Sequence, residues 1–134
     1  MKIGVPKEIK PQEHRIGLTP DSVKTLISEG HEVLVENNGG FEAGFDNEQY
    51  TSIGAKIVSK AEDIFNDADI IVKVKEPQPG EVKMIKENQI VYTYLHLAAA
   101  KGLTEGLIKS KGVCIAYETV TDDNGRLPLL APMS

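Results

Sequence analysis

The feature that most constrains the fold is an alternation of short apolar runs with amphipathic segments, repeated about every 20 residues. The apolar runs predict β-strands, and the segments between them predict helices. A strand, a helix and a second strand pair their strands in parallel through a right-handed crossover. The sequence therefore predicts an α/β fold, a Rossmann-like parallel sheet flanked by helices. The predicted strands cover residues 2–5, 31–36, 56–58, 69–74, 89–93 and 113–117.

Three patterns predict where helices begin. Thr19 before a proline is typical of a helix start, and Asp46 is a second candidate cap. Ser59, with Glu62 three residues later, has the spacing of a capping box. Two further helices are predicted, one over residues 80–87 and one with Leu103, Leu107 and Ile108 on a single face.

Composition excludes several classes of function. The 134 residues carry 15 Lys and Arg against 20 Asp and Glu, with 5% aromatic residues and no Trp, which disfavours a nucleic-acid surface. No apolar run approaches the roughly 18 residues of a membrane span, and no Cys/His cluster has metal-ligand spacing. The single cysteine, Cys114, excludes a disulfide within one monomer and fits a reducing, cytoplasmic location.

Ionisable residues follow three of the predicted strands. Ligands of open parallel sheets bind outside the carboxyl ends of the strands, which is where Lys75, His96 and Glu118 are predicted to lie. Lys75 could pair with a substrate carboxylate or polarise a carbonyl, and His96 could act as a general acid–base. The alternatives are an exposed strand-end lysine and a hydrogen-bonded core histidine. Glu118 is interpreted as a loop acid, and Lys73 as a neighbour of the site.

Two predicted loops contain residues of kinds that can bind ligands. The irregular stretch 7–17 is predicted to be a surface loop, in which Arg15 is either a surface charge or a two-pronged ligand for a carboxylate. The glycine-rich stretch 39–44 does not match G-x-G-x-x-G and is interpreted as a flexible loop. The residues alone thus predict a carboxylate-binding site with a possible acid–base histidine, and they do not name the reaction.

Seven motifs run in order along the whole chain, at residues 1–8, 13–20, 30–35, 72–77, 94–99, 116–120 and 127–134. Together they resemble the N-terminal part of alanine dehydrogenases. The related nicotinamide nucleotide transhydrogenases share the opening motif but lack the Leu-His-Leu-Ala-Ala and Leu-Leu-Ala-Pro-Met-Ser segments.

The resemblance implies reversible oxidative deamination of L-alanine to pyruvate and ammonia, with NAD as the hydride acceptor. It implies that Arg15 and Lys75 hold the substrate carboxylate and carbonyl, and that His96 is the catalytic acid–base. Met133 and Ser134 match the segment that leads to a second domain, where Ser134 contacts NAD.

The resemblance also implies a domain organisation. Residues 1–128 correspond to the first part of a substrate domain, and 129–134 to the start of the connection to an NAD-binding domain. A chain ending there is expected to be incomplete and inactive alone. The family implies a homo-oligomer, expected to be a hexamer; a separate NAD-domain chain is the other expected partner. Two alternatives remain open, a non-catalytic binding or assembly module and the N-terminal domain of a transhydrogenase alpha subunit.

Overall fold

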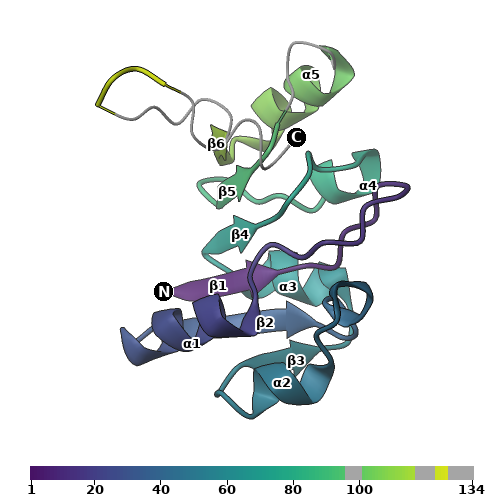
Figure 1. Cartoon of the computed structure of the whole chain (residues 1–134). Helices are drawn as coiled ribbons and strands as arrows, with labels where there is room; N and C mark the ends of the chain where they lie inside the picture. The colour runs from purple at the N-terminus through teal and green to yellow at the C-terminus, as the bar shows by residue number, and fades with distance from the viewer. Residues whose placement is uncertain (96–100, 117–122, 127–134) are drawn as a thin grey trace.

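The computed structural model describes residues 1–95, 101–116 and 123–126. Its described strands form one all-parallel sheet in the order β3-β2-β1-β4-β5-β6 (Figure 1). The predicted α/β fold with a parallel sheet is confirmed. The strand order reverses beside β1, because β2 follows on one side of it and β4 lies on the other. The strands are β1 Lys2–Val5, β2 Glu32–Glu36, β3 Lys56–Val58, β4 Ile70–Val72, β5 Ile90–Thr93 and β6 Val113–Ala116.

Two of the predicted helix starts are confirmed and one is wrong. The Thr19 side chain accepts a hydrogen bond from the Ser22 amide, and Asp46 forms a capping box with Gln49. The predicted Ser59 cap fails because the third helix begins one residue later, after Lys60, whose side chain makes no capping hydrogen bond. The helices are α1 Pro20–Ser28, α2 Asn47–Thr51, α3 Ala61–Asp67, α4 Pro79–Val82 and α5 Lys101–Ser110, with a 3₁₀ helix η1 over Phe41–Ala43.

Two helix predictions need correction. The helix predicted over residues 80–87 is the single turn α4, after which the Lys86 amide bonds to the Gln89 side chain and the chain turns into β5. Ile108 was predicted to share the buried face of its helix but is 72% exposed, whereas the neighbouring Leu107 is 7% exposed. Leu103 and Leu107, which are one turn apart, pack against the core, whereas Ile108 lies on the solvent side of the helix.

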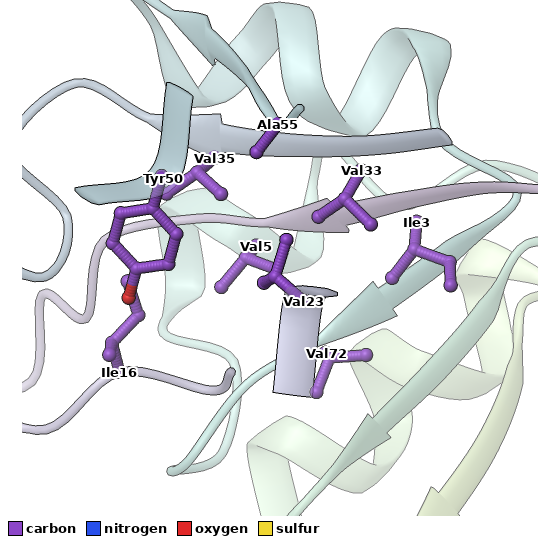
Figure 2. Packing of buried hydrophobic residues seen from close by; sticks show 9 residues of the cluster. All are labelled: Ile3, Val5, Ile16, Val23, Val33, Val35, Tyr50, Ala55 and Val72. Carbon is purple, nitrogen blue, oxygen red and sulfur yellow. The ribbon is translucent and has the colours of Figure 1, made fainter. Parts of the chain in front are cut away.

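Both faces of the sheet are covered, and successive strand residues alternate between two cores. Val33 and Val35 of β2 pack with Val23 of α1 and Tyr50 of α2, as Figure 2 shows. Leu34, between the two valines in sequence, belongs to the opposite core with residues of α3 and α5. This alternation is the period-two pattern of a strand whose two faces are both buried.

A long segment leaves β1 and crosses the carboxyl end of the sheet toward α4 before returning to α1 (Figure 1). Gly17 lets this segment lie close to the end of β4, because a Cβ there would be 2.5 Å from the carbonyl oxygen of Val72. One residue later, the Leu18 carbonyl accepts a 2.9 Å hydrogen bond from the Tyr50 hydroxyl. The segment is thus anchored to both β4 and α2. In the described part of the chain, no helix is both long enough and apolar enough for a membrane span.

Candidate substrate-binding site

An open hollow of about 390 Å³ lies where the strand order reverses, lined by residues 10–15 and Lys75. The first group belongs to the segment that leaves β1, and Lys75 comes shortly after β4. Ligands of open α/β sheets bind at this kind of reversal, outside the carboxyl ends of the two strands that diverge. The structure therefore brings Arg15 and Lys75, two of the predicted site residues, into one hollow. His96, Glu118, Met133 and Ser134 lie outside the described residues.

The guanidinium of Arg15 is held by Glu13. The Glu13 carboxylate accepts hydrogen bonds from Arg15 Nε at 2.9 Å, from Nη2 at 2.8 Å and from the Arg15 backbone amide at 2.9 Å. These bonds to Arg15 lower the pKa of Glu13 to about 2 and raise the pKa of Arg15. The clamp restricts the orientation of a planar donor group suited to a carboxylate ligand.

The ammonium of Lys75 lies against an aromatic ring. Its Nζ is 4.8 Å from the ring centroid of Tyr94, a cation–π distance. Tyr94 directly follows β5, and β5 is the neighbour of β4 in the sheet. Two side chains that follow adjacent strands, Lys75 and Tyr94, thus meet at this edge. Tyr94 was not among the predicted site residues, although it lies in the same predicted segment as His96.

The backbone of Lys75 is fixed from two sides. On the β5 side, the Thr93 hydroxyl donates to the Lys75 carbonyl at 2.7 Å, and the Tyr94 amide donates to the Val74 carbonyl at 3.2 Å. On the other side, the Glu8 carboxylate accepts from the amides of Val74 and Lys75, both at 3.1 Å. The strand predicted to reach residue 74 therefore ends at Val72, because beyond it the Glu8 side chain takes the place of a neighbouring strand as the acceptor on the β1 side.

Lys73 is buried beneath the hollow between two carboxylates. Its Nζ donates to Glu8 Oε1 at 3.1 Å and lies 3.1 Å from Glu81 Oε2. The second contact is an ion pair without hydrogen-bond alignment, and Glu81 Oε2 accepts no hydrogen bond from the described residues. Burial raises the pKa of Glu81, and the nearby Glu8 adds to this effect, although Lys73 opposes both. Glu8 is therefore the better satisfied of the two acids.

Sequence reasoning missed both of these carboxylates. A signal was nevertheless present, since Lys73 interrupts an apolar strand and a buried ammonium needs an acidic partner. The sequence does not say which of its 20 Asp and Glu residues takes that part. In the structure, the partners of Lys73 are Glu8 and Glu81, which are far from each other in sequence.

The hollow favours an anion. The cationic side chains of Lys10, Arg15 and Lys75 line it, and Glu13 is the single carboxylate among the described lining residues. Lys10 also pairs with Glu76 at 2.5 Å, which ties the segment after β1 to the residue that follows Lys75. An excess of cations in a concave surface attracts anionic ligands and raises their local concentration.

The glycine-rich stretch 39–44 serves packing. A Cβ on Gly40 would be 2.9 Å from the Tyr50 hydroxyl oxygen, and one on Gly39 would be 2.9 Å from the Glu36 carbonyl oxygen. The stretch also contains the 3₁₀ helix η1. Close contacts with the protein's own atoms account for these glycines, and in residues 1–95, 101–116 and 123–126 no strand-to-helix glycine loop offers a cradle for the phosphates of NAD.

A family model described as the N-terminal domain of alanine dehydrogenase and PNT matches residues 4–134. The chain belongs to this family. An alanine dehydrogenase from Halomonas elongata is 48% identical to this family member over the whole chain, which covers 36% of that protein. The family predicted from the sequence motifs is thereby confirmed.

Solved structures agree with this assignment. An L-alanine dehydrogenase superposes with a TM-score of 0.95 and 50% identity, over 98% of this chain and 36% of that one. A transhydrogenase from Sinorhizobium meliloti superposes with a TM-score of 0.82 and 25% identity, over 88% of this chain and 35% of that one. This alanine dehydrogenase/PNT N-terminal domain spans about a third of the length of these relatives, and its sequence is nearer to the dehydrogenase.

Proposed function

We propose that the chain supplies the substrate-binding part of an NAD-dependent alanine dehydrogenase, which interconverts L-alanine with pyruvate and ammonia. The observation that carries the proposal is the meeting of Arg15 and Lys75 in one cationic hollow at the reversal of strand order. Support for the identity of the reaction comes from relatives and a solved structure that bear the name alanine dehydrogenase.

Pyruvate carries a carboxylate next to a carbonyl, so two neighbouring cationic groups suit it. Arg15 would bind the carboxylate through paired hydrogen bonds. Lys75 would donate to the carbonyl oxygen and withdraw electron density from the carbon that ammonia attacks. His96, two residues beyond Tyr94 in sequence, would take up or release the proton. NAD supplies the hydride chemistry when it is bound.

The remaining assignments follow from the family. Residues 1–128 would form the first part of the substrate domain, and residues 129–134, with Met133 and Ser134, would lead toward the dinucleotide. The protein would act in the cytoplasm as a homo-oligomer or together with a separate NAD-binding chain. In this assignment the dinucleotide site belongs to a second domain, so we expect no NADH from the 134-residue chain given alanine and NAD.

Titration with pyruvate in a calorimeter tests the site itself. We expect saturable binding that is lost in Lys75→Ala and in Arg15→Ala. Lys24→Ala, which removes one positive charge from the exposed surface of α1, is the matched control and should leave the affinity unchanged. Equal weakening by all three substitutions would show that only net charge matters, and the proposed site would be wrong.

A further inference from the structure

We propose that Glu8 is a positioning residue, whose buried carboxylate fixes the backbone at Lys75 and so directs the Lys75 ammonium into the hollow. This inference rests on the proposed role of Lys75 in substrate binding. It gives a function to the buried ionic cluster of Glu8, Lys73 and Glu81, which lies beneath the hollow.

The contacts of Glu8 lead directly to Lys75. Glu8 Oε1 accepts from the Lys75 amide at 3.1 Å and from Lys73 Nζ at 3.1 Å, and Oε2 accepts from the Val74 amide at 3.1 Å. The side chains of Glu8 and Lys73 are 2% and 1% exposed. Hydrogen bonds that backbone amides donate to a charged acceptor are strong when water is excluded, so Glu8 holds this part of the backbone rigidly.

Glu8 accepts these hydrogen bonds at the point where the regular pairing of β4 with β1 has ended. The regular pairing of β4 with β1 covers only Ile70 and Ile71, and β4 itself ends at Val72. Beyond that point the Lys73 amide still donates to the Tyr92 carbonyl on the β5 side, at 3.0 Å. On the β1 side, the acceptors come from the side chain of Glu8. Without them, the amides of Val74 and Lys75 would lose their partners on that side.

Fixing the backbone limits the freedom of the side chain. The amide of Lys75 is held by Glu8, its carbonyl by Thr93, and its ammonium lies over the ring of Tyr94. A flexible lysine placed in this way loses less entropy when substrate arrives, and a displacement of about 1 Å can cost a factor of about 100 in reactivity. The geometry thus links a buried acid to the orientation of a half-buried cation.

Glu81 provides a matched control within the same cluster. Like Glu8 it is 2% exposed and lies 3.1 Å from Lys73 Nζ, but its other oxygen accepts from the Gln78 amide instead of from Lys75. Either Glu8→Gln or Glu81→Gln leaves Lys73 paired with one carboxylate. The two substitutions therefore change charge and volume equally and differ in the contact to Lys75.

The experiment combines pyruvate calorimetry with backbone amide exchange measured by NMR on the protein and its variants. We expect Glu8→Gln to weaken pyruvate binding by about tenfold or more, and to speed amide exchange at Val74 and Lys75 by a similar factor. The amides of Ile71 and Val91, inside the sheet, should keep their exchange rates. Glu81→Gln should change neither quantity more than about twofold.

Two outcomes overturn the inference in different ways. Fast exchange in Glu8→Gln with unchanged pyruvate affinity, while Lys75→Ala abolishes binding, would refute the positioning role and leave the proposed function standing. Unchanged binding in Lys75→Ala would overturn the proposed function, and the positioning role with it. Should Glu8→Gln fold poorly, Glu8→Asp keeps the charge but shortens the side chain, and the same increases in exchange and dissociation constant are expected.

Discussion

Arg15 and Lys75 line the same hollow, but the protein holds them in opposite ways. Arg15 is oriented at its side chain by Glu13, two residues away in a surface segment. Lys75 is oriented at its backbone by Glu8 and Thr93, which are 67 and 18 residues away in sequence. The first arrangement is local and partly exposed, and the second is buried and depends on the assembled sheet. Substitutions in the surface segment should therefore disturb Arg15, whereas substitutions in the buried sheet should disturb Lys75.

The largest effect is expected from Lys73→Met. The substitution leaves Glu8 and Glu81 buried without their shared cation, and breaking a buried ion pair from one side costs about 3–5 kcal/mol. Urea unfolding should show this loss. Lys2→Met, which breaks the exposed pair with Asp67, is the control and should cost far less. Similar losses in both variants would mean that the buried cluster is no more important than a surface pair.

Gly17→Ala should have an intermediate effect. The added Cβ would meet the Val72 carbonyl oxygen at 2.5 Å, so the segment that carries Arg15 has to move away from β4. We expect a loss of about 1–3 kcal/mol in unfolding free energy, together with weaker pyruvate binding. Gly80→Ala is the matched control, because a Cβ at Gly80 in α4 would have no neighbour within 4 Å. Unchanged pyruvate binding in Gly17→Ala would show that Arg15 does not need this anchor.

Glu81→Gln should alter the pH dependence of stability. The folded state raises the pKa of Glu81 above its ordinary value of 4.5, so it binds this proton more tightly than the unfolded chain does. Stability in the wild type should therefore fall as pH rises from about 4.5 through the higher pKa of the folded state. In Glu81→Gln this decline should be weaker, as measured by urea unfolding across that pH range. A decline as steep as in the wild type would show that other groups cause the loss of stability.

The smallest effect concerns Glu13. Its pKa of about 2, lowered chiefly by the hydrogen bonds from Arg15, means that the clamp is fully formed above pH 4.5. Its stabilising contribution should be lost as pH falls from 4.5 toward 2. An NMR titration of the side-chain carboxyl carbons should find Glu13 among the last acids to protonate. Glu13→Gln should weaken pyruvate binding only a few-fold, and a Glu13 that titrates near 4.5 would contradict the clamp.

Much of the fold was predictable because its signals are local. Apolar runs predicted the strands, and the caps at Thr19 and Asp46 depend on side chains three residues from their partners. The failures occurred where a local pattern competed with distant contacts. β4 stops at Val72, and Glu8 then accepts from the amides of Val74 and Lys75. Ile108 is exposed although its spacing fits a buried face.

The candidate site was predictable only in part. Lys75 was recognised from its place after a strand, and Arg15 acquired a role only through the resemblance to a family. Tyr94, Glu13 and Glu8 were not singled out, because nothing in their local sequence distinguishes them from other aromatic or acidic residues. Their contacts with Lys75 and Arg15 became evident once distances were known.

The sequence by itself determined the class of fold and the presence of cationic residues beyond the strands. Hydrophobic periodicity and the ends of apolar runs depend only on neighbouring residues in the chain. Only the tertiary structure decided that β4 lies beside β1, which places the Arg15 segment and Lys75 at one reversal of strand order. It alone also paired Lys73 with Glu8, 65 residues away. Strand order and the partners of buried charges depend on which surfaces pack together, and that is a property of the whole chain.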